Sequence, residues 1–472
     1  MSTGVRKATC SILTGTDEGY KMREDKENLT PVVIVGLHTK ESDEEFDHAM
    51  KELKSLCEAC DLEVMSTLIQ TLPHPDNSTW IGSGKAEELA MHVRGCDASY
   101  AVCLGNLLPA QMKNLQKIID VPVWDRTNLI LEIFSRRAHT REARLQVESA
   151  YLQYMLPRLT GMWQHLGRQS GGGGSRANKG IGEKQIELDR RQISHRITEL
   201  RKELANIDRT RDVQRKGRER DGYPNVALVG YTNAGKSSLM NRLLDMGDPD
   251  AAKSAEKKVF EKNMLFATLD TSIRKIAICD RKPFLLSDTV GFIENIPHDL
   301  IKAFRSTLAE VRYADALLIV MDSSDPHHEM HRKVTEDTLR DLDAMGIPRI
   351  YVYNKADLRD RELNIKNEPG SDIIYISART GYGIDVLLDR LQDIFLADSH
   401  MIDILIPYTS GNLLSLLHNG ADIISEEHKE NGTHVIARCP AAMADRIGSQ
   451  LQDDQKMYMA TGVKGGDDAQ TL

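Results

Sequence analysis

The stretch VALVGYTNAGKSSLMNRLL (residues 226–244) joins a run of small apolar residues to a helix-like pattern through a segment rich in glycine and serine. Within it, Gly230 is followed by four residues and then by Gly235, Lys236 and Ser237. This spacing is typical of a loop between a strand and a helix whose backbone N–H groups surround a phosphate chain. The sequence therefore predicts a nucleotide site at this loop.

The predicted loop supplies most of the groups that would contact the phosphates. We expect the Lys236 ammonium to reach the β- and γ-phosphates and the Ser237 hydroxyl to ligate Mg²⁺. The expected contacts in this loop are Gly230, Tyr231, Thr232, Asn233, Ala234, Gly235, Lys236, Ser237 and Ser238. A loop of this kind on its own leaves ATP and GTP both open as ligands.

Two later segments carry residues suited to the γ-phosphate and its metal ion. KPFLLSDTVGF is a strand pattern that ends at Asp288, which can hold Mg²⁺, and Gly291 follows with an N–H that can meet the γ-phosphate. In NMLFATLDTSIRK, Thr268 is our choice for a threonine that binds Mg²⁺ and γ-phosphate, with Thr271 as competitor and a purely structural turn as the alternative. Lys236, Thr268 and Gly291 are the expected catalytic residues.

Two further strand ends carry residues suited to guanine. The Asp357 carboxylate in RIYVYNKADL can accept hydrogen bonds from N1–H and N2–H₂ of guanine, a donor pair that adenine lacks. Asn354 would brace the loop and contact N7, and the backbone of Ser377 and Ala378 would donate to O6. The expected base contacts are Asn354, Lys355, Asp357, Ser377, Ala378 and Arg379. Four such pieces in order, each after a strand, are the layout of a GTPase domain.

One absence bears on the hydrolysis rate. Gly291 is followed by Phe292, where Ras-type GTPases place a glutamine near the attacking water. Phenylalanine cannot orient water, so we expect slow intrinsic hydrolysis and a polar group supplied by another loop or by a partner.

The bulk composition is that of a globular chain of about three domains. Its 472 residues are 40% hydrophobic and 28% charged, and the net charge of −9 argues against bulk attraction to nucleic acid. Seven scattered cysteines indicate no disulfide framework, and no apolar run is long enough for a membrane span or a signal peptide. We therefore expect a cytoplasmic protein. Cys57 and Cys60 form a C-x-x-C pair in a helix-like run, for which we expect burial rather than metal or redox use.

The pattern of strands and helices predicts a multidomain α/β protein. Strands alternate with helices both before and after a long helical stretch, and a strand–helix–strand pattern with an ENGT turn closes the chain. The predicted parts are a flexible arm (1–30), an N-terminal α/β domain (31–135), a helical hairpin with a glycine-rich tip (136–220), a GTPase domain (221–398), a C-terminal α+β domain (399–456) and a flexible tail (457–472). In the last domain, His418 and His434 are expected to be structural.

The helical stretch predicts an antiparallel hairpin. Its second helix carries an apolar seam at heptad-like spacing, formed by Ile186, Ile193, Ile197, Leu200, Leu204 and Ile207. The residues expected to face it are Leu145, Val147, Ala150, Leu152 and Tyr154. Around the glycines of the tip, the candidate RNA contacts are Arg168, Arg176, Lys179 and Lys184. A solvated linker explains the tip equally well on sequence alone.

Five stretches together resemble the HflX-type GTPases, ribosome-associated members of the translation-factor-related class. They are DRTNLILEIFSRRAHTREARLQVESAYLQYMLPRLTGMW, GGGGSRANKGIGEKQIELDRRQI, GYTNAGKSSLMNRL, LFATLDTS and DTVGFIENIPHDLIKAFRSTLAEV. The resemblance implies binding of GTP and GDP with Mg²⁺, association with the large (50S) ribosomal subunit, and ribosome splitting or rescue under stress. It also implies that the hairpin tip approaches ribosomal RNA. We expect a monomer.

Two rival functions and one further ligand stay open at this point. The rivals are a GTPase of another pathway, such as tRNA modification, and an RNA-binding or RNA-unwinding protein with a regulatory nucleotide site. The resemblance also raises weak ATP binding by the N-terminal domain, for which Gly82, Gly84 and Lys85 in WIGSGKAEEL are the candidates. A turn before a helix explains that stretch as well.

Overall fold

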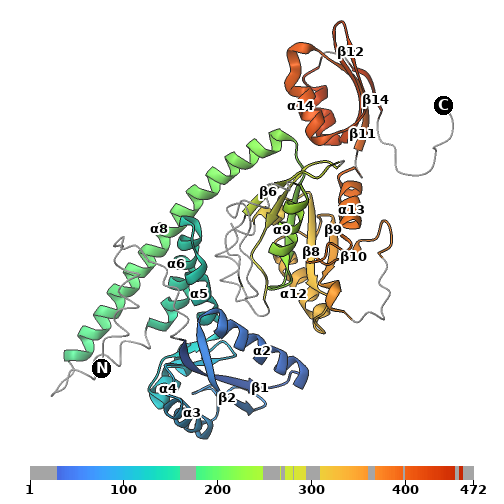
Figure 1. Cartoon of the computed structure of the whole chain (residues 1–472). Coiled ribbons are helices and arrows are strands. Elements are labelled where there is room, and N and C mark those ends of the chain that lie inside the picture. The colour runs from blue at the N-terminus through green and yellow to red at the C-terminus, as the bar shows by residue number, and fades with distance from the viewer. Residues whose placement is uncertain are drawn as a thin grey trace.

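The computed structural model contains three sheets among the residues that it describes, and the long helix α8 runs along one side of the molecule (Figure 1). The described residues are 29–159, 177–247, 266, 272–279, 281–293, 309–359, 367–396, 399–451 and 456–460. Of the helices in these ranges, none combines the length and hydropathy that crossing a lipid bilayer demands. The predicted multidomain α/β architecture is confirmed.

The N-terminal domain is a four-stranded parallel sheet in the order β2-β1-β3-β4. Its strands are β1 (Thr30–His38), β2 (Leu62–Thr71), β3 (Tyr100–Cys103) and β4 (Val123–Asp125), and its helices are α2 (Asp43–Ala59), α3 (Ser83–Gly95) and α4 (Pro109–Ile119). The central strand β1 is buried along most of its length, as its continuous apolar pattern requires of a parallel strand covered on both faces. A capping box between Ser42 and Glu45 starts α2, the helix that faces the GTPase domain.

The predicted antiparallel hairpin is formed by α6 and α8. The elements of this part are α5 (Arg126–Arg137), α6 (Arg141–Met155), η1 (Leu156–Arg158) and α8 (Ala177–Asp221). Leu145 and Leu152 of α6 pack on Ile197 and Leu200 of α8, so this part of the predicted seam is confirmed.

The assignment of three other α6 residues to that seam was wrong. Val147, Ala150 and Tyr154 lie in the core shared with the N-terminal domain. The reason is that α6 is apolar on two faces, one toward α8 and one toward the N-terminal domain, and spacing alone does not say which neighbour each face meets. Ion pairs Glu142–Arg211 (2.9 Å) and Glu148–Arg196 (2.8 Å) fix the antiparallel direction.

The GTPase domain contains a six-stranded sheet in the order β10-β9-β8-β5-β7-β6, in which only β6 runs antiparallel to its neighbour. Its strands are β5 (Asn225–Gly230), β6 (Ser272–Ile276), β7 (Phe284–Asp288), β8 (Ala316–Asp322), β9 (Arg349–Asn354) and β10 (Ile373–Tyr375). Its described helices are α9 (Lys236–Gly247), α11 (Ala309–Arg312), α12 (His328–Asp341), η4 (Ala356–Leu358) and α13 (Ile384–Leu396). The parallel strands therefore bring Gly230, Asp288, Asp322 and Asn354 to one edge of the sheet.

The C-terminal domain is an antiparallel sheet in the order β12-β13-β11-β14 with two helices. Its elements are β11 (Ser399–Ile406), η5 (Tyr408–Ser410), α14 (Gly411–Gly420), β12 (Asp422–Lys429), β13 (Gly432–Pro440), α15 (Ala441–Gly448) and β14 (Lys456–Ala460). The predicted end of this domain at residue 456 was wrong, because β14 continues into the expected tail. By pairing with β11, β14 satisfies a strand that would otherwise be an open sheet edge.

The N-terminal and GTPase domains share one hydrophobic core. Tyr231, Phe266, Val290 and Ile293 of the GTPase domain lie in the same buried cluster as apolar residues of α2, α5 and α6. The rings of Phe134 and Phe266 meet edge to face at 4.7 Å. The nucleotide loop, to which Tyr231 belongs, is thus packed against another domain.

Replacing Leu200 by alanine tests the hairpin seam. Leu200 is fully buried between the helices, so Leu200→Ala is expected to cost about 2–4 kcal/mol of the free energy of unfolding and to raise amide hydrogen exchange in α6 and α8. Leu188→Ala is the matched control, since Leu188 is 51% exposed on the same helix. Equal protection of the two variants from exchange would show that the seam does not hold the hairpin.

Candidate functional site

The loop between β5 and α9 has a backbone that requires its two glycines. Gly230 (φ 145°) and Gly235 (φ 92°) have dihedrals that residues with a side chain rarely adopt. A Cβ at Gly230 would overlap the carbonyl of Val320, and one at Gly235 would overlap the side chain of Asn354. The loop therefore runs close against both neighbours and ends at Lys236, the first residue of α9, where free backbone N–H groups favour an anion.

Lys236 is held inside this loop. Its Nζ donates to the carbonyl oxygens of Gly230 (3.0 Å) and Tyr231 (2.8 Å). Burial lowers the pKa of the ammonium to about 8, and the nearby Asp288 carboxylate acts in the opposite direction. A phosphate group placed beside this buried cation would favour its charged form.

Ser237 and Asp288 place two oxygen ligands next to each other. The Ser237 hydroxyl donates to Asp288 Oδ2 at 2.7 Å, and Asp288 is fully buried at the end of β7. Hydroxyl and carboxylate oxygens in this arrangement are suited to Mg²⁺. The backbone of Gly291 lies beside Lys236, since an added Cβ at Gly291 would be 3.0 Å from Lys236 Nζ. Thr268 and Thr271, the candidates for the second switch contact, lie outside the described residues.

The carboxamide of Asn354 connects the phosphate loop to the predicted base segments. Its Nδ2 donates to the Ala234 carbonyl (3.0 Å), and its Oδ1 accepts from the backbone N–H of Ala378 (3.0 Å). Asn354 is 2% exposed, so both bonds are shielded from water. The loop and the two base segments are thereby held as one unit.

Asp357 is prepared as an ionised acceptor. The Ser377 hydroxyl donates to Oδ1 at 2.6 Å, and the Arg379 guanidinium meets Oδ2 at 2.6 Å. The hydrogen bond from Ser377 is the main cause that lowers the pKa of Asp357, with Arg379 adding to it against a modest effect of burial. Arg379 is 74% exposed, so its side chain can leave Oδ2 to a base.

The backbone N–H groups of Ser377 and Ala378 are hydrogen-bonded within the protein. The N–H of Ser377 donates to the Tyr382 carbonyl (3.0 Å), and that of Ala378 is engaged by Asn354. These bonds engage both donors in the present conformation, so their donation to guanine O6 stays a prediction. Lys355 adopts a left-handed conformation (φ 62°), and its Nζ contacts Asp322 Oδ2 at 2.6 Å.

Two sets of residues around the loop were missed from the sequence. Asp322 has the same strand-end position as Asp288 and Asn354, and this position could have indicated it. The other set joins the loop to the N-terminal domain: the Tyr231 hydroxyl donates to Glu52 Oε1 (2.7 Å), and Glu52 Oε2 pairs with Arg126 (2.7 Å). No local pattern points to Glu52, because the contact spans two domains.

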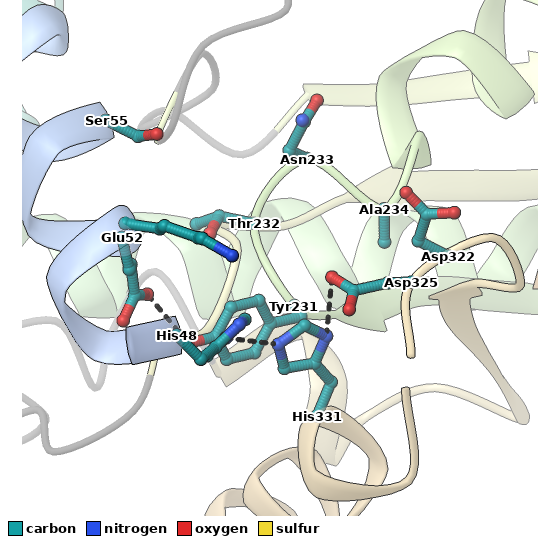
Figure 2. A pocket seen from close by; sticks show the side chains of 11 residues that line it. His48, Glu52, Ser55, Tyr231, Thr232, Asn233, Ala234, Asp322, Asp325 and His331 are labelled. Atoms are coloured by element: carbon teal, nitrogen blue, oxygen red, sulfur yellow. Dashed lines mark hydrogen bonds and ion pairs between the residues drawn. The ribbon is translucent and has the colours of Figure 1, made fainter. Parts of the chain in front are cut away.

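A cavity of about 190 Å³ lies between these two domains (Figure 2). It is lined by His48, Lys51, Glu52, Ser55, Tyr231, Thr232, Asn233, Ala234, Asp322, Asp325 and His331. Its floor is therefore the phosphate loop itself, and one wall is α2.

The remaining candidate residues are those predicted to contact RNA or ATP. Arg168 and Arg176 fall outside the described residues, as do the side chains of Lys179 and Lys184 on α8, so RNA contact by the tip stays a prediction. In the N-terminal domain, Gly82 precedes α3 and Lys85 pairs with Glu88 at 2.9 Å; ATP binding there, including a role for Gly84, is untested.

The expected burial of the cysteine pair is confirmed. Cys57 and Cys60 are fully buried in the N-terminal core, where burial raises the pKa of each thiol to about 12. A thiol that stays protonated is a poor nucleophile and metal ligand.

Three family models match successive parts of the chain. The descriptions are GTP-binding GTPase N-terminal (residues 47–135), GTP-binding GTPase Middle Region (137–218) and 50S ribosome-binding GTPase (225–355). GTPase HflX from Caldanaerobacter subterraneus subsp. tengcongensis is 39% identical over 94% of this chain and 99% of that protein. The chain belongs to the HflX family of GTPases. GTPase HflX from Escherichia coli K12 is 37% identical over 81% of this chain and 88% of that protein.

A solved structure is similar over much of the chain. It is described as a GTP-binding protein from the hyperthermophilic archaeon Sulfolobus solfataricus in complex with GDP, with 25% identity, a TM-score of 0.40 and coverage of 77% of this chain and 98% of that one. The HflX membership shows that this chain is a GTPase, as its phosphate loop and base segments predicted.

The lowered pKa of Lys236 predicts that GTP binding takes up a proton at high pH. At pH 9 the free site has largely lost this proton, whereas a bound phosphate favours the ammonium, so GTP affinity is expected to fall as pH rises above about 8. Below pH 7 the lysine is charged in both states and contributes no uptake. Calorimetry in buffers of different ionisation enthalpy measures the uptake. Lys236→Arg, which stays protonated, is expected to abolish it; absence of uptake by the unmodified protein at pH 9 contradicts the assignment.

Proposed function

We propose that this chain is a GTP-driven switch that binds the large ribosomal subunit and splits or rescues ribosomes under stress. The observation that carries the nucleotide part is the single unit in which Asn354 holds the phosphate loop to the segment beside Asp357. The ribosomal part is supported by the match of residues 225–355 to GTPases described as 50S ribosome-binding.

In this proposal each group of the site has one role. Asp357 selects guanine, and Lys236 together with the N–H groups of the loop holds the phosphates. Ser237 and Asp288 fit a Mg²⁺ ion, which when bound would neutralise charge on the phosphates. Catalysis then rests on positioning and charge neutralisation, with Gly291 placed to contact the γ-phosphate and Thr268 as the proposed second switch residue.

The residue after Gly291 gives a reason for partner-dependent hydrolysis. Phe292 is 2% exposed and packs in the core of the GTPase domain, so it offers no polar group to an attacking water. We infer that intrinsic hydrolysis is slow and that a bound partner supplies the missing group.

The long helix α8 supplies a path from the nucleotide site to the hairpin. It ends at Asp221, four residues before β5 begins, and Arg215 of α8 lies 3.5 Å above the ring of Tyr313. The other end of α8 begins at Ala177, and its first two turns carry Lys179 and Lys184. A conformational change in the GTPase domain would therefore move α8. In this proposal GTP stabilises the conformation that docks on the ribosome, and hydrolysis releases the protein.

Ribosome binding is tested with three forms of the full chain. The unmodified protein with a non-hydrolysable GTP analogue is expected to co-sediment with large subunits, and subunits are expected to raise its GTP turnover. Deleting residues 171–177 should remove both effects and leave basal hydrolysis unchanged, because this segment contains none of the residues assigned to the nucleotide site. Lys236→Ala should lose turnover altogether. No co-sedimentation and no stimulation of the unmodified protein would favour a different pathway or an RNA-unwinding role.

The role of Asp357 is tested by exchanging its carboxylate for an amide. Asp357→Asn is expected to lower GTP affinity at least about tenfold, because the amide replaces one of the two acceptor oxygens facing N1–H and N2–H₂ with an NH₂ donor. The same variant is expected to gain affinity for xanthosine triphosphate, whose C2 carbonyl accepts a bond from the new amide. Binding titrations with GTP, ATP and xanthosine triphosphate measure this. An unchanged GTP-over-ATP ratio means that Asp357 does not recognise the base.

A further inference from the structure

Three ligand-bearing side chains meet where the N-terminal domain touches the GTPase domain. His48 is on α2, whereas Asp325 and His327 follow β8 in the segment DSSDPHHEMH. One ligand atom from each of the three lies within 4.8 Å of the others, and the rings of His48 and His327 have centroids 4.1 Å apart. All three are half-buried, and His48 and Asp325 line the cavity whose floor is the phosphate loop.

His331, on α12, contacts two members of this cluster, His48 and Asp325 (Figure 2). Its Nε2 is 3.3 Å from Nε2 of His48, and its Nδ1 is 3.8 Å from Oδ2 of Asp325. It is 5% exposed and its ring stacks on Tyr231 at 3.8 Å, so it has little freedom to turn away. Such a neighbour orients ligands in the way that outer residues of metal sites do.

The donor set indicates which kind of ion would fit. Two imidazoles and one carboxylate are typical ligands of Zn²⁺, whereas Mg²⁺ and Ca²⁺ prefer oxygen ligands alone. Bonds of about 2.0–2.1 Å in a tetrahedral site place ligand atoms about 3.3 Å apart. His327 Nδ1 already lies 3.3 Å from Asp325 Oδ1, and one ligand atom of each of the three residues lies within 4.8 Å of the others. Side-chain rotation would bring the three atoms to this spacing, and water would take the fourth position.

We propose that His48, Asp325 and His327 form a binding site for a zinc-class divalent ion that clasps the N-terminal domain to the GTPase domain. The ligands come from both domains, so the ion would oppose their separation. The clasp adjoins the nucleotide loop, because Tyr231 of that loop stacks on His331 and donates to Glu52 one helical turn after His48. The inference depends on the geometry of this interface and not on the ribosomal role.

The site is tested on the metal-free full chain, without nucleotide or Mg²⁺ and with accessible thiols blocked, since Cys279 is exposed. Titration with Co²⁺ is expected to show one equivalent with the absorption of cobalt bound by nitrogen and oxygen. Zn²⁺ is expected to displace it and to raise the unfolding temperature. His48→Ala and His327→Ala are each expected to lower Zn²⁺ affinity at least about tenfold.

The control variant is His92→Ala. His92 lies on α3 of the N-terminal domain, away from the cluster, and its Nδ1 meets the Ser66 hydroxyl at 2.8 Å. The Zn²⁺ affinity of the His92→Ala variant should therefore equal that of the unmodified protein. GDP binding and circular dichroism verify that each variant is folded, and His48→Gln and His327→Gln replace any alanine variant that is not. The proposal is overturned if the folded cluster variants bind Zn²⁺ as tightly as the control, or if the unmodified protein binds no Zn²⁺. The three residues would then be only a hydrogen-bonded cluster.

Discussion

The buried carboxamide of Asn354 is the interaction on which the nucleotide site depends. It donates to the carbonyl of Ala234 in the phosphate loop and accepts from the N–H of Ala378 beside the base segment. These segments are separated by more than a hundred residues, and each would otherwise be a free loop at the edge of the sheet. A buried hydrogen bond contributes only about 1 kcal/mol net, but the geometric constraint fixes the distance between the group that selects the base and the group that holds the phosphates. Gly235 serves the same contact, because any side chain there would occupy the position of the carboxamide.

The N-terminal domain acts as a second support for the same loop. Tyr231 is buried in the core of the other domain and donates to Glu52, whose second oxygen pairs with Arg126. Glu52 and Arg126 are each about 5% exposed, so removing either partner would leave an uncompensated buried charge. The loop that binds phosphate is therefore also a contact surface between domains. A movement of the N-terminal domain would therefore act directly on this loop.

Much of the site could be predicted because its chemistry is local in sequence. The spacing of Gly230, Gly235 and Lys236, and the polar residues after successive apolar strands, follow from how a parallel sheet gathers its strand ends. Contacts between distant elements could not be predicted in this way. Spacing identified the apolar residues of α6 but not which neighbour each would meet, so Val147 was assigned to the wrong side. The pairing of β14 with β11 and the bond between Tyr231 and Glu52 have no periodic or motif signal. The bonds from Ser377 to the Tyr382 carbonyl and from Ala378 to Asn354 likewise have no signal in the sequence.

The most direct test of this account is a crystal structure of the chain with GDP bound. The account predicts that the β-phosphate lies on the N–H groups of Gly235 to Ser237 beside Lys236. It also predicts that the guanine edge displaces Arg379 from Asp357 and pairs with that carboxylate, while Asn354 keeps its bond to the loop. A diphosphate bound elsewhere, or a base that does not touch Asp357 while the phosphates occupy the loop, would contradict the claim that these groups form one guanine-nucleotide site.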